Sequence, residues 1–251
     1  MIKLIQVLCF IFVTVGCQTS SLKTKEPNTK KAEIILDHKY FIVSYNPLAK
    51  LPNWVSYHLY AKNLKNKIAK RKNKFFADPQ LIQMNLPYAK PNSFDGKIYD
   101  RGHMSPSEDF TFDQGANDET FVMTNMAPQT KKLNRGAWKV LENTVRKWAC
   151  ASGELLVISG PIIESDLEKF SSGVYIPKRF FKVILDETYP RKAIGFIYNQ
   201  TDVGPVLEKN VVTINELEHI TGETFLDELT DAEKNIKTES DIKKWAEADC
   251  S

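Results

Sequence analysis

The chain has few of the residues that build metal-bound or disulfide-rich scaffolds. It contains four cysteines and four histidines in 251 residues, and none of them shows the close paired spacing of a structural zinc site. No internal repeat is present, which excludes a repeat architecture. The only long apolar run, residues 4–15, is shorter than a helix needs to span a bilayer comfortably. These absences favour a globular protein without structural zinc.

Charge of one sign is not in large excess either. The net charge of +3 and the isoelectric point near 8.5 are too mild to demonstrate a polyanionic partner. Residues 50–90, however, carry nine Lys and Arg against one acid, whereas residues 216–251 carry eleven acids against four lysines. The basic stretch is either a solvated face or a surface that attracts phosphate. Few Phe or Tyr interleave with its lysines at 62–74, so it predicts no base-stacking platform for single strands.

The N-terminus predicts export. A short positive region precedes the apolar run at 4–15, as in a signal peptide. The Thr-Val-Gly-Cys sequence that ends at Cys17 resembles a bacterial lipobox, in which the cysteine is acylated and becomes the first mature residue. Thr14 departs from the Leu that this pattern prefers. We expect an export signal at 1–16 and lipidation at Cys17, with an ordinary secretory peptide cut nearby as the alternative.

The next residues predict a spacer between the lipid and the folded part. Because residues 18–33 have almost no apolar content, we expect 17–36 to be a flexible tether. The protein would then be exported and lipid-anchored to the bacterial cell envelope, facing the periplasm or the surface, or otherwise secreted. Cys150 and Cys250 could pair in such an oxidising compartment. The sequence does not give their separation, so the pairing stays open.

Residues 37–251 are expected to form one domain, because 42% hydrophobic residues suffice for a single core. Apolar spacing predicts helices at 131–150, 214–220 and 240–248. Short β-branched or aromatic runs predict strands at 40–45, 54–60, 121–125, 155–163, 180–186 and 193–198. Strands without regular helical crossovers between them predict an α+β fold with a central antiparallel sheet flanked by helices.

The run Asp-Arg-Gly-His at 100–103 has the residues for phosphate chemistry. Histidine is the side chain whose ordinary pKa lies near neutrality, so a neutral His103 could take a proton from water that attacks a phosphodiester. In an extended segment Arg101 lies on the same face, where its guanidinium could meet phosphate oxygens. Gly102 between them allows close approach of backbone or substrate.

A second group of candidate residues follows near the start of the long helix. Asn134 offers a neutral oxygen ligand, which suits a hard cation that keeps most of its waters. Glu142 lies eight residues further on, about 12 Å along a helix, so the two would not bind one ion directly. Glu142 is better suited to hold a metal-bound water. Taken singly, each of these residues is more typical of a turn, a cap or a solvated position.

Together the motifs are specific. The runs Asp-Arg-Gly-His at 100–103, Thr-Asn-Met-Ala-Pro-Gln at 124–129 and Asn-Arg-Gly-Ala-Trp at 134–138, followed by Glu142, occur in the order and at the spacing of one family. The chain resembles the DNA/RNA non-specific endonucleases, the ββα-metal group that includes the Serratia nuclease and mitochondrial endonuclease G. The resemblance covers residues 37–229.

The resemblance implies a ββα-metal motif on the antiparallel sheet, with His103 on a strand and Asn134 on the following helix. It implies that His103 is the general base, Asn134 the ligand of one Mg²⁺ (for which Mn²⁺ can substitute), and Glu142 a ligand of the ion's water shell. Arg101 and Asn125 become site residues, and the products carry 5′ phosphates. The family often has a further arginine upstream; Arg71 and Arg135 are the candidates for this substrate-binding role.

Two other functions stay open at this stage. The chain could be a catalytically inactive nucleic-acid-binding lipoprotein, or a hydrolase of another phosphodiester on the same scaffold. The basic stretch favours a long polyanion, because contacts to several phosphates make binding strong. An adhesion or structural lipoprotein would explain the export signal but not the motifs. We therefore expect a metal-dependent endonuclease of DNA and RNA, and the sequence leaves a dedicated inhibitor protein open as a partner.

Overall fold

The computed structural model describes residues 33–226 and 231–250. The expected export signal, the lipidation site Cys17 and most of the tether lie outside these residues. The first described strand is β1 (Ile34–Asp37), so regular structure begins three residues before the expected domain start at 37. Within the described part of the chain, no helix is both long and apolar enough to cross a membrane.

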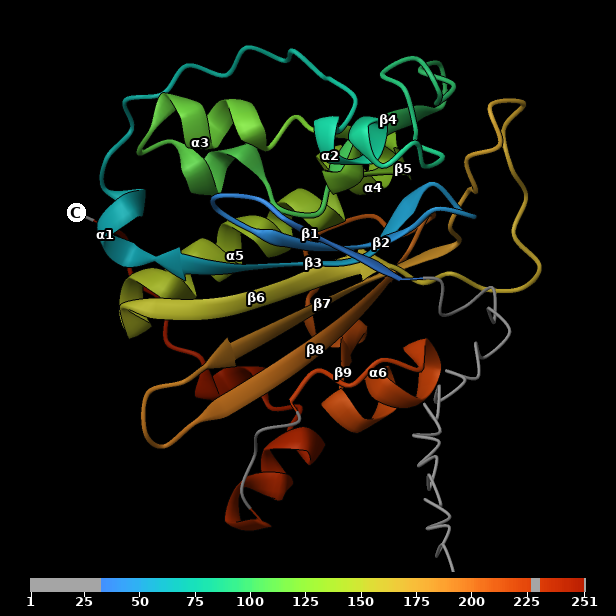
Figure 1. The fold of residues 1–251 in the computed structure, drawn as a ribbon. Helices are drawn as coiled ribbons and strands as arrows, with labels where there is room; N and C mark the ends of the chain where they lie inside the picture. The colour runs from blue at the N-terminus through green and yellow to red at the C-terminus, as the bar shows by residue number, and fades with distance from the viewer. Residues whose placement is uncertain (1–32, 227–230, 251) are drawn as a thin grey trace, which may run out of the picture.

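The core of the fold is a sheet of seven strands in the order β1-β2-β3-β6-β7-β8-β9, each antiparallel to its neighbours. This confirms the α+β class with a large antiparallel sheet (Figure 1). The remaining strands of the sheet are β2 (Ile42–Asn46), β3 (Leu51–Tyr60), β6 (Glu154–Pro161), β7 (Arg179–Asp186), β8 (Lys192–Asn199) and β9 (Val211–Val212).

Both faces of the sheet are covered, because its central strands are apolar on both sides. On β7, Phe180 and Ile184 join the core beneath α5 (Ala137–Ser152), whereas Phe181 and Val183 join a second core with α6 (Ile214–Thr221). Side chains of a strand alternate between its faces, so one strand supplies both cores. The short helices are α1 (Ala61–Leu64), α2 (Pro79–Gln83), α3 (Gln114–Glu119) and α4 (Lys131–Arg135).

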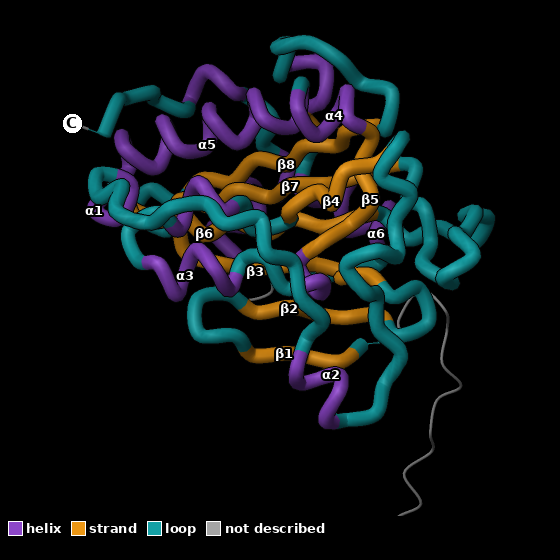
Figure 2. Tube along the Cα trace, turned by 90° about the horizontal axis from the view of Figure 1, so that it is seen from above, coloured by secondary structure: helices purple, strands orange, loops and turns teal. Residues whose placement is uncertain are grey.

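A separate two-stranded sheet carries the sequence motifs. Strand β4 (Tyr99–His103) pairs antiparallel with β5 (Met126–Thr130), and His103 lies opposite Met126. The chain then enters α4 and α5, which completes a ββα arrangement (Figure 2). Between β4 and β5 lie η1 (Ser107–Phe110), α3 and η2 (Met123–Asn125). Three further 3-10 turns occur later, η3 (Glu208–Asn210), η4 (Asp231–Thr238) and η5 (Ile242–Lys244).

Gly136 divides the helix expected at 131–150. It separates α4 from α5 with φ −110° and ψ −109°, and a Cβ at this position would lie 2.4 Å from the carbonyl oxygen of Lys132. Glycine therefore allows the chain to change direction between the two helices.

Two other secondary-structure predictions were wrong. Residues 121–125 do not form a strand: Val122 makes a single parallel β-bridge with Phe76, and residues 123–125 form the turn η2. Residues 240–248 hold only the short turn η5. Strands β4 and β5 did not follow from the apolar pattern, since β4 is polar and β5 contains Pro128.

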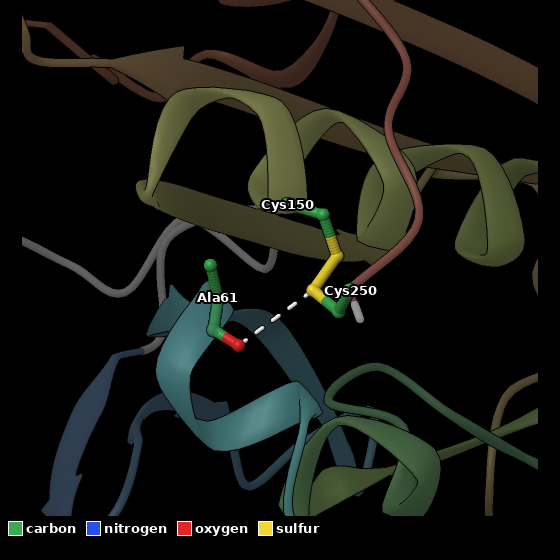
Figure 3. Close-up of a disulfide and its surroundings, with 3 residues drawn as sticks. All are labelled: Ala61, Cys150 and Cys250. Atoms are coloured by element: carbon green, nitrogen blue, oxygen red, sulfur yellow. Dashed lines mark hydrogen bonds between the residues drawn. A yellow bond between two sulfur atoms is a disulfide. The ribbon is translucent and has the colours of Figure 1, made fainter.

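The C-terminal segment is fastened to α5. Cys150 and Cys250 form a disulfide with a Cα–Cα distance of 5.2 Å, which answers the pairing that the sequence left open (Figure 3). Cys250 Sγ also lies 3.6 Å from the carbonyl oxygen of Ala61 at the start of α1. The ring of Trp245 packs on that of Trp148 with centroids 4.9 Å apart. This segment thus closes the end of α5 that is remote from β4.

Candidate active site

A cleft of about 520 Å³ opens where β4, α4 and the loop before α2 meet. Its walls are mostly polar and basic, as a site for a phosphate ester requires. The cleft is lined by Arg71, Asn73, Phe75, Phe94, Gly96, Tyr99, Asp100, Arg101, Lys131, Asn134 and Arg135. It therefore gathers four predicted site residues from three separate segments of the chain.

His103 lies at the end of β4 behind this lining. Its ring packs against Phe75, which lines the cleft, with centroids 6.0 Å apart, and meets Phe121 edge-on at 5.0 Å. Only 7% of the residue is exposed, and Nε2 has no hydrogen-bond partner among the described residues. Burial, together with the positive charge of Arg71, lowers the pKa of His103 to about 3. The imidazole is therefore neutral at physiological pH, with a nitrogen free to accept a proton.

Two arginines stack on the phenylalanines that contact His103. The guanidinium of Arg101 lies 4.1 Å from the ring centroid of Phe75, and Arg101 Nη1 donates to the carbonyl oxygen of Pro91 at 2.7 Å. The guanidinium of Arg71 lies 5.0 Å from the ring centroid of Phe121 and contacts the hydroxyl of Ser107. Such stacking holds a guanidinium in place while its edge stays available to an anion. Both arginines line the cleft.

Asn134 and Arg135 share one carboxylate at the start of the helical segment. Asn134 Nδ2 donates to Asp100 Oδ2 at 2.9 Å, and Arg135 donates to both oxygens of Asp100 at 2.7 and 2.8 Å. Partial burial alone would raise the pKa of Asp100, but these hydrogen bonds bring it below its ordinary value. No donor from the described residues reaches the amide oxygen of Asn134. Asp100 therefore orients the amide and leaves its oxygen free.

Asn125, predicted as a site residue, does not line the cleft. It is fully buried, and its Oδ1 accepts from the backbone N–H of Ser105 at 2.8 Å. Its Nδ2 donates to the carbonyl oxygens of Ser105 and Thr120, at 2.9 and 2.8 Å. Both donors and one acceptor position of the amide are taken by backbone, and the side chain is fully buried, so it does not reach a substrate in the cleft. Asn125 instead fixes the backbone that directly follows His103.

Glu142 does not line the cleft. It lies partly buried on α5, where its charged neighbours are Lys182, Arg146 and Asp109. Burial raises the pKa of Glu142 to about 7, against the opposing effect of the Lys182 and Arg146 charges. The structure thus places Asn134 in the lining of the cleft and Glu142 outside that lining.

Comparison with known proteins identifies the fold and the motifs together. The sequence model of the DNA/RNA non-specific endonuclease family matches residues 18–232. The chain belongs to this family. A nuclease of Nostoc sp. is 33% identical over 215 residues, which is 81% of this chain and 76% of that protein. Human mitochondrial endonuclease G is 27% identical over 205 residues, which is 74% of this chain and 67% of that protein.

A solved structure supports the same assignment. The structure of EndoG in complex with EndoGI superposes with a TM-score of 0.70 and 26% sequence identity, covering 78% of this chain and 86% of that chain. The protein is accordingly a DNA/RNA non-specific endonuclease, a hydrolase of the nuclease class. The match also confirms the fold expected from the resemblance.

The structure of this endonuclease adds residues that sequence reasoning missed. Phe75 and Phe121 enclose His103, and Asp100 orients Asn134. Asp100 stood within the motif, but only its tertiary contacts show its function. Phe75 and Phe121 carried no sequence signal, because an aromatic residue beside a basic stretch or a turn is common.

One other cluster in the described residues could hold a divalent metal ion. The ligand atoms of His58, Glu154 and Glu187 lie within 4.8 Å of one another. His58 and Glu154 come from the adjoining ends of β3 and β6, and none of the three lines the cleft. His58 Nδ1 is already 2.8 Å from Glu154 Oε1, an exposed pair that is stable without an ion. This cluster is therefore distinct from the cleft.

Proposed function

We propose that this nuclease hydrolyses phosphodiester bonds of DNA and RNA with a divalent metal ion, without sequence preference, and releases 5′-phosphate products. The observation that carries the proposal is the neutral imidazole of His103, whose Nε2 has no partner among the described residues, in the same region as two stacked arginines and an Asn134 amide oxygen that no described donor reaches. These are a base, phosphate ligands and a cation ligand in one region. Few other reactions need all three.

His103 is proposed as the general base. Its Nε2 would accept a proton from a water molecule whose oxygen bonds to phosphorus, while the bond from phosphorus to the 3′ oxygen breaks. The phosphate then stays on the 5′ oxygen of the product. Burial meets one requirement of this role, because it keeps the imidazole unprotonated at neutral pH.

Arg71 and Arg101 are proposed as phosphate ligands. Their guanidinium groups are ordered by Phe121 and Phe75, so less conformational freedom is lost when they bind an anion. Their charges flank the phosphate and favour the additional negative charge of the transition state. Arg135 is a weaker candidate for a phosphate ligand, because its Nε and Nη2 already donate to the carboxylate of Asp100.

The residues at the cleft fit a hard divalent cation. Asn134 would hold the ion through its free amide oxygen, a neutral ligand that suits an ion which keeps most of its waters. Glu142 would act on this water shell from outside the lining of the cleft. Bound Mg²⁺, or Mn²⁺ in its place, would stabilise charge on the phosphorus centre and on the leaving 3′ oxygen.

We propose that this nuclease domain lies outside the cytoplasm. The domain is the predicted range 37–251, extended at its start to include strand β1. The support is the signal-like N-terminus, the lipobox-like sequence at Cys17 and the disulfide between Cys150 and Cys250, which suits an oxidising compartment. The membrane would be contacted through the lipid alone. An inhibitor protein is a reasonable partner, because the EndoG structure contains its inhibitor.

Cleavage of plasmid DNA and of RNA by the purified protein tests the proposal. We expect Mg²⁺-dependent cleavage of both, loss of cleavage in excess EDTA, and a fall of about 10²- to 10⁴-fold in His103→Ala. His219→Ala, an exposed histidine on α6, is the matched control and should keep full activity. If the wild type binds nucleic acid but cuts neither substrate, the protein is a binding module. Hydrolysis of bis(4-nitrophenyl) phosphate alone would instead indicate a hydrolase of another phosphodiester.

A further inference from the structure

Three side chains that commonly bind metal ions gather at one end of the seven-stranded sheet. The ligand atoms of His58, Glu154 and Glu187 all lie within 4.8 Å of one another. His58 lies on β3, Glu154 begins β6, and Glu187 directly follows β7; these strands are neighbours, and the three ends lie together at the left of Figure 1. None of the three residues lines the cleft. The proposed nuclease chemistry therefore makes no use of this cluster.

The register of the sheet brings these side chains to the same face. His58 lies opposite Leu156, which comes two residues after Glu154. Residues opposite one another in a sheet share a face, and so do residues two apart on one strand. Leu156 also lies opposite Leu185, and Glu187 comes two residues after Leu185, just past the end of β7. Backbone pairing thus places the three candidate ligands side by side.

The imidazole of His58 is held in place within the cluster. Its ring stacks on that of Tyr60, with centroids 6.0 Å apart and 19° between the ring planes. Its Nδ1 lies 2.8 Å from Glu154 Oε1, and the two side chains are 44% and 43% exposed. An exposed ion pair contributes little to stability, so an ion that takes over both ligands displaces little. The pair is therefore ordered and also open to an ion from solvent.

The carboxylate of Glu187 adds a charge that no cation of the described chain compensates. Glu187 is exposed, and the ion pair within the cluster joins His58 to Glu154 and not to Glu187. Two carboxylates face one imidazole, so the cluster is negative whether the imidazole is protonated or neutral. Carboxylates held this close repel each other, and a divalent cation between them would remove that repulsion.

The kinds of ligand favour zinc over magnesium. Imidazole and carboxylate are both common zinc ligands, whereas Mg²⁺ prefers a shell of oxygen atoms. Three protein ligands leave the fourth tetrahedral position to water. Zinc bonds of about 2.0–2.2 Å set the ligand atoms roughly 3.4 Å apart in tetrahedral geometry. Small rotations of these exposed side chains would bring their ligand atoms from within 4.8 Å to that separation.

We propose that His58, Glu154 and Glu187 form a zinc site that fastens the turn after β7 to the ends of β3 and β6. This ion is separate from the one proposed for the cleft and takes no part in phosphodiester hydrolysis. Residues 187–191 connect β7 to β8, and Tyr189 in this turn is 94% exposed. Because folding brings the three ligands together, a bound ion should stabilise the folded state.

The experiment is a calorimetric titration of the purified full chain with ZnCl₂, after treatment with EDTA and removal of the chelator. Excess Mg²⁺ is present throughout to occupy the cleft. The variants His58→Ala and Glu187→Gln each remove one proposed ligand. His219→Ala and Glu208→Gln, at exposed positions outside the cluster, are the matched controls. Asn134→Ala tests whether zinc binds at the cleft instead.

Wild type and both controls are expected to bind one Zn²⁺ at this site with equal affinity, and the two ligand variants to bind it at least tenfold more weakly. Asn134→Ala should bind zinc as wild type does. Co²⁺ in place of Zn²⁺ should give the visible absorption of a tetrahedral ion in wild type and not in His58→Ala. Zinc affinity that is unchanged in His58→Ala, or lost in Asn134→Ala or in excess Mg²⁺, would overturn the proposal.

Thermal unfolding gives a second readout. Zn²⁺ should raise the Tm of wild type and of both controls and leave that of His58→Ala unchanged. An equal rise in wild type and His58→Ala would place the stabilising ion elsewhere and contradict the site. If His58→Ala does not fold, Glu187→Gln, altered at an exposed turn, carries the same comparison. Neither readout needs nuclease activity, so failure of the zinc site is distinguished from failure of the proposed function.

Discussion

The amides of Asn125 and Asn134 are used in opposite ways. Asn125 is fully buried and gives its amide to the backbone of Ser105 and Thr120. Asn134 donates to Asp100 and keeps its oxygen free at the cleft. The difference lies in the partners that surround each side chain. Asn125 therefore holds the backbone beside the site in place, and Asn134 is available to a ligand.

Replacing Asn125 with alanine should destabilise the protein. The change leaves the Ser105 and Thr120 backbone groups buried without partners, which costs about 2–4 kcal/mol of unfolding free energy. Urea denaturation measures this, and Asn66→Ala, at an exposed position, should stay within about 0.5 kcal/mol of wild type. Equal urea midpoints for the two variants would contradict a stabilising role of the Asn125 hydrogen bonds.

The depressed pKa of His103 predicts a pH-dependent stability. The pKa is about 3 in the folded protein and near 6.5 when unfolded, so the unfolded chain binds the extra proton. The stabilisation that neutral His103 permits is complete above pH 6.5 and is lost as the pH falls toward 3. The unfolding free energy of wild type should therefore fall more than that of His103→Asn between pH 7.5 and 4.5. Parallel curves for the two proteins would show that the imidazole titrates normally.

At the scale of elements, the joint between α4 and α5 positions the cation ligand. α4 has only five residues and follows directly on β5, so Asn134 stays close to Asp100 of β4. α5 takes a new direction after Gly136 and packs on the sheet. A continuous helix would carry Asn134 along the direction of α5. The break therefore separates a short ligand-bearing turn from a structural helix.

Gly136→Ala tests this joint. The new Cβ would meet the carbonyl oxygen of Lys132, which is backbone and cannot move aside cheaply. We expect a loss of about 1–3 kcal/mol in unfolding free energy, and a higher Mg²⁺ concentration for half-maximal cleavage. Gly96→Ala, where a Cβ has no heavy atom within 4 Å, is the control for stability. A stable Gly136→Ala variant with normal Mg²⁺ dependence would rule out this role for the break.

At the scale of the whole molecule, the distribution of charge determines from which side a polyanion approaches. The loop between α1 and α2, which contains six of the nine basic residues of the stretch 50–90, passes over α3 toward the β4–β5 pair (Figure 1). Its lysines are exposed, and Arg71 within it lines the cleft. The disulfide fastens the acidic C-terminal segment to the end of α5 that is remote from β4. Long polyanions would therefore approach from the basic side.

Salt dependence measures this contribution. Each phosphate contact adds about 0.9 to the slope of log binding constant against log salt on duplex DNA. Changing Lys67 and Lys70 to Gln should lower that slope by about 2 if both contact phosphates. The matched control changes Lys209 and Lys243, two exposed lysines away from the loop, and should keep the wild-type slope. An unchanged slope in the first variant would make the loop lysines a solvated face.

Local patterns predicted those parts of the fold that local spacing controls. Apolar residues at helical spacing predicted α5, and the runs around β3, β6, β7 and β8 predicted strands close to their observed bounds. The same method misplaced a strand at 121–125, because Phe121 is buried against Phe75 and His103 and the segment pairs only through the isolated bridge of Val122 with Phe76. Burial by packing and burial by pairing give the same sequence signal.

The sequence by itself determined which chemical groups are present and in what order, because the motifs at 100–103, 124–129 and 134–138 are defined by short spacings. Only the tertiary structure decided what each group does. Asn125 binds the backbone after His103, His103 is held neutral, and Glu142 lies outside the lining of the cleft. The physical reason is that burial and charge compensation depend on residues far apart in the chain, and a local pattern contains no record of those contacts.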